Sequence, residues 1–427
     1  MSDSLSALRL PFVRSFALGR AFAVLGGQVL STAVGWELYR RTRDPWSLGL
    51  VGLFELIPVL VFLVASGHVA DRVPRRRVAM AAHGLHALAA LGLAESARRG
   101  APTSWIYGCL LLVGTARSFA APSVGTILPQ LLTPPQLLNA NAWMAAILEL
   151  ATIVGPAVGG LLIAGTEGVL VAYVFAAASQ AVFVVCLTFV PLRPPPPASP
   201  TRGLRHLFAG FGFVRRTPVF LAAITLDLFG VLLGGAVALL PVFAEDILHV
   251  GARGLGWLRA APAVGALAMA LAITRMRPWR RPGRALLVAV TGFGLSTVGF
   301  GLSTHLGLSL LCLALTGVFD TVSVVIRVTL GQVLTPDGLR GRVAALTYVF
   351  IGLSNELGAF ESGAVASFVG TQASVVLGGL GTLGVVAVVA SVWPQLARIG
   401  PLDTLRPTTD VARAAGGGAF PPAAPPT

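Results

Sequence analysis

The chain alternates long apolar stretches with short polar ones. Twelve of the stretches reach the roughly 20 mostly apolar residues that a helix needs to cross a bilayer. They cover residues 16–38, 47–70, 78–97, 105–127, 141–164, 168–190, 218–244, 255–275, 284–303, 306–326, 343–368 and 373–394. Several are rich in glycine and alanine, which let helices pack closely in lipid. The pattern predicts an all-α membrane protein with twelve transmembrane helices.

The composition narrows the range of functions. Of 427 residues, 55% are hydrophobic and 11% are charged, against about 25% charged in soluble proteins. The chain has no lysine, so it lacks the G-x-x-x-x-G-K-[ST] loop that binds nucleotide phosphates. The sequence offers neither a metal-ligand spacing nor a nucleophile beside a base. We therefore expect no enzyme activity, no cofactor and no metal site, and we expect an ion gradient to supply the energy.

All 31 basic residues are arginines, and their distribution indicates how the chain crosses the membrane. With the N-terminus placed in the cytoplasm, 22 arginines fall in segments on that side and six on the other, as the positive-inside rule requires. Arg40, Arg41 and Arg43 go against this trend. The bias predicts a multi-pass protein of the cell inner membrane with both termini cytoplasmic. It also accounts for the net charge of +14, so no nucleic-acid partner is needed.

A polar segment that begins PLRPPPPASP divides the twelve stretches into two sets of six. Similar loops follow the fourth and tenth stretches: QLLTPPQL begins at Gln130 and QVLTPDGL at Gln332, a shift of 202. This repeat predicts two pseudo-symmetric six-helix halves. The predicted regions are an N-terminal half, a cytoplasmic linker, a C-terminal half and a disordered cytoplasmic tail, at residues 1–190, 191–217, 218–395 and 396–427. One such chain can enclose its own path, so we expect a monomer.

Charged residues inside the apolar stretches are candidates for function, because a charge in a membrane usually faces a cavity or a partner. They are Arg20, Glu55, Arg117, Glu149, Asp227, Arg259, Asp320, Glu356 and Glu361. A carboxyl group held away from water can exchange a proton, and it can also contact a cationic substrate. The residues predicted to take part in proton coupling or substrate contact are Arg20, Glu55, Arg117, Asp227 and Asp320.

Structural ion pairs are the alternative explanation for these charges. Asp320 could pair with Arg327, two turns along the same helix. Arg259 lies close to a predicted membrane face, where a long side chain can extend to the interface. If Asp227 carries the proton, Asp227→Asn is expected to abolish proton-coupled transport while leaving folding intact.

Residues 67–78 read GHVADRVPRRRV and connect the second stretch to the third. The pattern G-x-x-A-D-R-x-x-R-R resembles the signature loop of the major facilitator superfamily, with Pro74 where a glycine is commoner. PSVGTILPQL from Pro122, DTVSVVIR from Asp320 and SNELGAFESG from Ser354 are similar to the branch that contains the enterobactin exporter and related drug-efflux proteins. The resemblance covers roughly residues 10–395. It implies the major facilitator fold.

The resemblance assigns a role to this loop. Gly67, Asp71, Arg72 and Arg76 would form a cytoplasmic latch that fastens the two halves together in one conformation and releases them in the other. Alternatively, the arginines of the loop only fix the topology of the membrane spans.

A second motif lies in the fifth stretch. GPAVGG resembles the antiporter motif GPxxGG of exporters, with Gly155, Pro156, Gly159 and Gly160 at its fixed positions. The alternative is a packing kink, because proline bends a helix and glycine lets a neighbouring helix approach. Arg117 resembles a fourth-span arginine used in proton coupling, although the glutamine and glycine that follow it in that motif are absent here.

These observations predict a secondary active transporter that exports a small, partly hydrophobic molecule, a drug or a siderophore, by proton-coupled alternating access. The expected partners are the small-molecule substrate, protons and the lipid bilayer. An importer or uniporter of a small metabolite is the alternative, and the GPxxGG motif argues against import.

Overall fold

The computed structural model describes residues 7–193 and 211–402. Within this part the side chain of Asp71 is among a few that lie outside the described atoms. Most of the predicted linker and the predicted disordered tail also lie outside the described residues. Residues 211–216, at the end of the predicted linker, are helical.

The described chain is built from helices and contains no strand. The first half consists of α1 (Pro11–Thr42), α2 (Pro45–Arg72), α3 (Arg75–Arg99), α4 (Thr103–Val124), α5 (Ile127–Leu131), α6 (Pro134–Gly165) and α7 (Leu170–Thr188). The second half consists of α9 (Pro218–Leu233), η1 (Ala236–Leu239), α10 (Leu240–Val242), η2 (Phe243–Ile247), α11 (Gly251–Ile273), α12 (Pro282–Leu302), α13 (Leu306–Leu334), α14 (Asp337–Val369), α15 (Thr371–Val392) and α16 (Pro394–Ala397). Twelve spans of the described chain are long and apolar enough to cross a membrane, so the predicted all-α membrane fold is confirmed.

The repeated Q-x-L-T-P-x-x-L loops are sharp junctions between helices. In the first copy Thr133 is the N-cap of α6 and Pro134 its first residue, and the Thr133 backbone N–H donates to Gln136 Oε1 at 3.1 Å. Proline suits this position because a first-turn residue needs no backbone N–H. In the second copy Thr335 ends α13 and Pro336 begins α14 as its N-cap. Both copies therefore stop one span and start the next within two residues.

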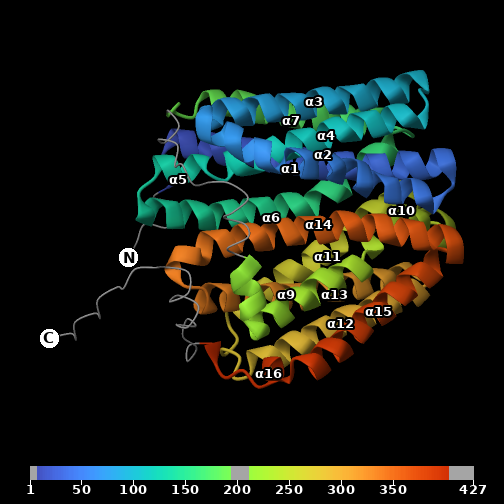
Figure 1. The fold of residues 1–427 in the computed structure, drawn as a ribbon. Coiled ribbons are helices and arrows are strands. Elements are labelled where there is room, and N and C mark those ends of the chain that lie inside the picture. Colours follow the sequence, from blue (N-terminus) through green and yellow to red (C-terminus); the bar gives the residue numbers. More distant parts are fainter. Residues whose placement is uncertain (1–6, 194–210, 403–427) are drawn as a thin grey trace.

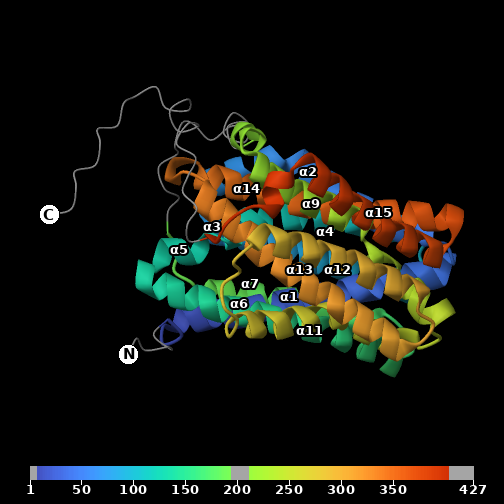
Figure 2. The same cartoon turned by 90° about the horizontal axis from the view of Figure 1, so that it is seen from below.

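The helices of each half form a bundle, and the two bundles lie side by side (Figures 1 and 2). Within the first half α1 and α3 pack on α7, and α2 and α3 pack on α4. The halves meet along two helix pairs, α2 with α14 and α6 with α11. α1 begins and α15 ends at the same end of the molecule, which we call the terminal end; the opposite end is the far end (Figure 1).

The outer surface carries many large apolar side chains. Leu88 is 65% exposed, Val288 66% and Phe368 85%. Such exposure is unfavourable in water when it covers a whole surface, and it suits contact with lipid tails. Together with the twelve spans, it makes this a multi-pass membrane protein.

The seventh span departs from the single continuous helix that the sequence predicts. After α9 ends at Leu233, the chain passes through the short 3₁₀ segment η1, one turn of α10 and the π-helical η2 before α11 begins. Gly234 and Gly235 lie at the first break. A Cβ atom on Gly235 would approach the carbonyl oxygen of Gly358 in α14 to 2.8 Å, so the break lets the two helices touch.

Candidate functional site

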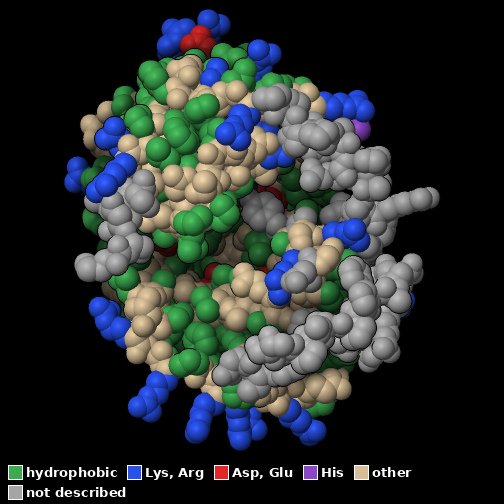
Figure 3. All heavy atoms as spheres, turned by 90° about the vertical axis from the view of Figure 1, so that its left-hand side faces the viewer, with side chains coloured by type: hydrophobic (Ala, Val, Ile, Leu, Met, Phe, Trp, Pro, Cys, Tyr) green, Lys and Arg blue, Asp and Glu red, His purple; other side chains and the backbone are tan. Residues whose placement is uncertain are grey.

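A central cavity opens at the terminal end. Figure 3 looks onto this end and shows a hollow near the middle, with acidic side chains inside it. The far end is closed, because the contacts between the halves involve the first turns of α2 and α11, which both begin there. The charged residues discussed below lie between the open and the closed end.

Glycines close the far end. A Cβ on Gly52 of α2 would lie 2.6 Å from the carbonyl oxygen of Glu356 in α14. In the symmetry-related contact, a Cβ on Gly160 of α6 would lie 2.5 Å from the carbonyl oxygen of Ala252 and 3.0 Å from the Cα of Gly256 in α11. Only glycine permits backbones to approach this closely.

The glycines of the GPxxGG motif in α6 pack against two different helices. Gly155 and Gly159 face α1, where added Cβ atoms would meet Gln28 at 2.5 Å and Thr32 at 3.2 Å. Gly160 faces α11 of the other half. Pro156 lies inside α6, and its carbonyl oxygen would be 2.8 Å from a Cβ on Gly256. The motif thus joins α6 both to its own half and to the opposite half.

We expect Gly160→Ala to disfavour the closed far end, because the added methyl group would collide with backbone rather than with a side chain that can move. Spin labels at the exposed positions Ser104 and Arg253, one in each half near the far end, should then report a longer distance between the halves. Gly165→Ala is the matched control, since no atom lies within 4 Å of its added Cβ. Equal distances in the two variants would show that the Gly160 contact does not hold the far end closed.

Polar groups link the halves beyond the glycines. The hydroxyl group of Tyr39 in α1 donates to Asp246 in η2. Arg43, which caps α1 in the left-handed conformation (φ 51°), reaches Asp246 at 3.0 Å and Glu245 at 3.1 Å. The acids of η2 therefore give Arg43 a structural partner, and the arginine trio that ran against the charge bias is partly explained.

The first ion cluster joins both halves through one arginine. Arg117 of α4 forms an ion pair with Glu55 of α2 in its own half. The same Nη1 atom lies 3.0 Å from Glu356 Oε1 on α14 in the other half. The carboxylate side chains are 13% and 20% exposed, whereas half of the Arg117 side chain is open to the cavity. The sequence predicted Glu55 and Arg117 as site residues, and the fold brings them together.

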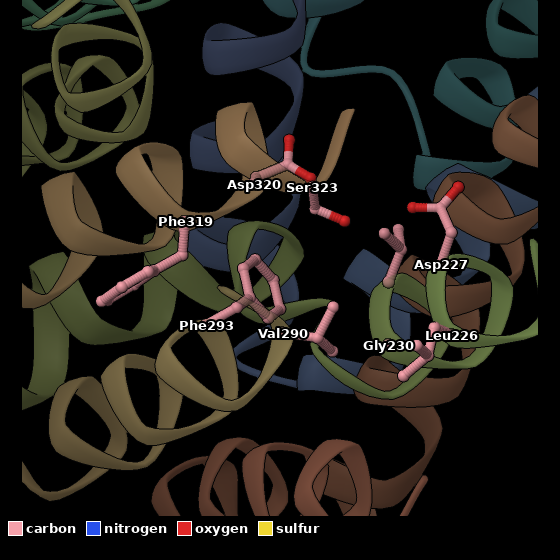
Figure 4. A pocket seen from close by; sticks show the side chains of 9 residues that line it. Leu226, Asp227, Gly230, Val290, Phe293, Phe319, Asp320 and Ser323 are labelled. Carbon is pink, nitrogen blue, oxygen red and sulfur yellow. The ribbon is translucent and has the colours of Figure 1, made fainter. Parts of the chain in front are cut away.

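The second cluster lies within the second half. Arg327 of α13 forms an ion pair with Asp227 of α9, and the two side chains are only 7% and 11% exposed. Arg327 Nε also lies 3.2 Å from Ser323 Oγ. The suggested pair of Asp320 with Arg327 is not formed within 4.0 Å among the described residues, because Arg327 pairs with Asp227 of α9, but Arg327 still acts on Asp320 electrostatically. Asp320 lines the same pocket as Asp227 (Figure 4).

The internal repeat relates α2 to α11 and α4 to α13, and each of these helices carries a charged residue at the equivalent position. G-x-x-E-x-x-P, from Gly52 to Pro58 in α2, matches G-x-x-R-x-x-P, from Gly256 to Pro262 in α11. Glu55 thus corresponds to Arg259. Arg117 and Asp320 lie equally far from the first residues of α4 and α13, so they also correspond. The charges are reversed between the halves.

Two of the remaining charged candidates have different surroundings from those expected. Arg259 does not extend to a membrane face: its Nη2 atom lies 3.0 Å from Ser31 Oγ on α1, and its Nη1 atom is buried without a hydrogen-bond partner among the described residues. Arg20 lies close enough to His83 of α3 to act on it electrostatically. Glu149 and Glu361 form no ion pair in the described chain.

The residues of the predicted latch lie mostly in helices, and the connection between α2 and α3 is reduced to Val73 and Pro74. Gly67 and Arg72 belong to α2, and Arg72 is exposed. Arg76 of α3 donates to the carbonyl oxygen of Val190 at 2.7 Å, within its own half. The side chain of Asp71 is outside the described part, so the latch stays a prediction for the conformation in which the terminal end closes.

Two charged residues of the interior were missed from the sequence. Arg327 was placed in a cytoplasmic segment because the tenth apolar stretch was ended at residue 326, yet α13 continues to Leu334. Glu37 lay at the edge of the first stretch. It accepts a hydrogen bond from Tyr173 at 2.5 Å and pairs with Arg41. The four-residue spacing of Ile326, Leu330 and Leu334, all buried, was the signal that could have extended the tenth helix.

Comparisons with known proteins agree with this architecture. Enterobactin exporters named EntS from Shigella boydii serotype 18 and Escherichia coli O81 are both 30% identical to this chain over 375 residues, which is 87% of the chain and 89% of each relative. A crystal structure of a peptide transporter POT has a TM-score of 0.72 at 12% identity, covering 91% of this chain and 95% of that one. The nucleoside transporter NupG has a TM-score of 0.71 at 14% identity, covering 90% and 99%.

The family assignment follows from sequence rather than from fold alone. The Major Facilitator Superfamily matches residues 16–359, a range that includes every residue of both ion clusters. The relatives and the structural neighbours are transporters, not enzymes. This chain is therefore a transporter that belongs to the Major Facilitator Superfamily.

Proposed function

We propose that the protein is a proton-coupled exporter of the inner membrane, with both termini in the cytoplasm, that acts as a monomer on a small, partly hydrophobic molecule. Export is supported by the relatives, which are enterobactin exporters. It is also supported by the GPxxGG motif. The uneven distribution of arginines supports cytoplasmic termini. Arg327 lies within the span formed by α13, so it no longer counts as cytoplasmic, but this removes only one of the 22 arginines on that side. In this orientation the cavity described above opens to the cytoplasm.

The observation that carries the proposal is the sharing of Arg117 between the halves. Outward opening requires α14 to move away from α4 at the far end, and the contact between Arg117 and Glu356 must then break. One guanidinium facing two carboxylates leaves an excess negative charge in a poorly hydrated place, which is unfavourable. Once the far end has opened, a proton on one carboxyl group removes that charge, and its later release restores the carboxylate that binds Arg117.

The proposed cycle follows from these contacts. Substrate enters the cavity from the cytoplasm while Arg117 and the glycine contacts hold the far end closed. Protons reach the Arg117 cluster from outside once the far end opens and leave it toward the cytoplasm once that end closes. The contacts between the halves at the far end must separate each time that end opens. One movement therefore allows both proton binding and substrate release.

Proteoliposomes that contain the full chain and a pH-sensitive dye test this proposal. With a pH gradient imposed, a panel of lipophilic cations, macrolides, tetracyclines and catechol siderophores is screened for proton flux triggered by the substrate. We expect at least one compound to move against protons in wild-type vesicles and not in empty ones. Substrate movement without any proton flux would instead support a uniporter.

A further inference from the structure

The connection between α11 and α12 lies at the terminal end, because α11 begins at the far end and crosses the bundle. α11 ends at Ile273 and α12 begins at Pro282. Residues 275–284 read RMRPWRRPGR, with five arginines and no acidic residue, and we call them the arginine loop. Its arginines are Arg275, Arg277, Arg280, Arg281 and Arg284, and all five side chains are exposed.

The arginine loop is not neutralised by the fold around it. In the part of the chain that the structure describes, none of its arginines has an ion pair within 4.0 Å or a side-chain hydrogen bond. Several arginines near the far end do have acidic partners. These pairs are Arg41 with Glu37, Arg43 with Glu245 and Asp246, and Arg98 and Arg99 with Glu95.

The remainder of the sequence offers no surplus of acid for the loop. The residues outside the described part contain three aspartates and four arginines, so their own net charge is positive. Like charges held close together repel one another, and a partner of opposite charge relieves that repulsion. The negative charge that suits this loop must therefore come from outside the chain.

The position of the loop indicates which partner it meets. Trp279 is partly buried and packs against the apolar cluster of the second half, and tryptophan is typical of the membrane interface. A Cβ on Gly283 would overlap the carbonyl oxygen of Leu396 in α16, so the start of α12 is held firmly. Figure 3 shows arginine side chains that project outward along the lower rim of the terminal end, the side on which α12 and α16 lie in Figure 1. The loop thus lies at the edge of the spans, at the level of lipid headgroups.

We propose that the arginine loop binds the phosphate groups of anionic phospholipids in the leaflet at the terminal end. Guanidinium groups bind phosphate oxygens through paired hydrogen bonds, and a cluster of basic residues next to a span suits anionic headgroups. The alternative is that these arginines only fix the topology of the spans, and they would then show no preference among lipids. The inference depends neither on the direction of transport nor on proton coupling.

Local fluorescence quenching measures which lipid gathers at the loop. Met276→Cys, at an exposed position of the loop, is labelled with a fluorophore, and the three native cysteines are buried and stay unlabelled. The full-length protein is placed in phosphatidylcholine vesicles with a minor share of phosphatidylglycerol. A nitroxide quencher is carried on the acyl chain of one lipid or of the other. We expect the phosphatidylglycerol probe to be enriched about fivefold over the phosphatidylcholine probe, equivalent to about 1 kcal/mol.

Two controls need no change to the arginines. A fluorophore at Ser104→Cys, exposed near the far end, should show no preference between the probes. About 1 M sodium chloride should remove most of the enrichment at Met276→Cys, because exposed charges are screened over about 3 Å at that concentration. Enrichment that persists unchanged in this salt would exclude the charge interaction.

Two triple variants, each combined with labelled Met276→Cys, locate the charge that is responsible. The loop variant removes three exposed arginines that have no partner in the described chain, so we expect it to fold and to lose the enrichment. The far-end variant removes the same charge elsewhere and should keep the enrichment. They are Arg275→Gln/Arg277→Gln/Arg280→Gln and Arg98→Gln/Arg99→Gln/Arg253→Gln.

Three results would overturn the inference. The first is equal quenching by the two lipid probes at Met276→Cys in the otherwise unchanged protein. The second is enrichment that survives in the loop variant. The third is an equal loss of enrichment in both triple variants, because the net charge of the protein rather than the loop would then attract the lipid. None of these measurements uses a substrate or a gradient, so they leave the proposed function untouched.

Discussion

Arg327→Gln is expected to destabilise the protein by about 3–5 kcal/mol, because breaking a buried ion pair leaves an uncompensated charge. The side chains of Arg327 and Asp227 are both nearly buried, so water cannot replace the lost partner. A thiol-reactive fluorescent dye measures the effect during heating. The three cysteines are buried in the folded protein and react only when it unfolds. The midpoint of unfolding should fall well below that of wild type.

The double variant Asp227→Asn/Arg327→Gln should recover much of this loss, since two neutral amides can hydrogen-bond in the place of the ion pair. Arg253→Gln changes an exposed arginine of α11 in the same way, and we expect an effect of no more than about 0.5 kcal/mol. The ion pair also alters the expectation for Asp227→Asn, which now should weaken folding as well as transport. A wild-type melting midpoint for Arg327→Gln would contradict the pairing itself.

Arg117→Gln is expected to reduce gradient-driven transport by about 100-fold or more, the range typical of removing a group that takes part in proton transfer. Without the guanidinium, Glu55 and Glu356 lose the cation that they share. The far end would also lose its charged link between α4 and α14. Substrate-triggered proton flux in proteoliposomes measures the loss.

Glu356→Gln separates the two roles of Arg117. This variant keeps the Glu55 pair and removes the excess carboxylate from the cluster. We expect it to let substrate move down its own gradient while proton flux disappears. Full proton-coupled transport by Arg117→Gln would exclude the cluster from coupling.

The membrane fold could be predicted from the sequence because it depends on local composition. Long apolar runs specify spans wherever they occur, and the repeated Q-x-L-T-P-x-x-L loops mark equivalent helix junctions. Boundaries were less certain where a charge interrupted a run. The tenth span was ended before Arg327 for this reason, although α13 continues to Leu334.

Which charges meet could not be predicted, because it depends on helices far apart in the sequence. Asp320 and Arg327 are two turns apart on one helix, which places them about 10 Å apart along its axis, whereas Asp227 approaches Arg327 from α9. Likewise, nothing local to Glu356 indicated that it would share Arg117 with Glu55. Charged residues are unusual in membrane spans, so the sequence was enough to select candidate site residues. It was not enough to predict which of them contact one another.

The single guanidinium shared by two carboxylates also bears on the stoichiometry of transport. One excess negative charge is neutralised by one proton, so the Arg117 cluster has room for one proton in each cycle. If the molecule carried outward bears one positive charge, the exchange moves no net charge across the membrane. The membrane potential would then contribute nothing to the driving force, and the pH difference alone would set how far the substrate can be concentrated outside.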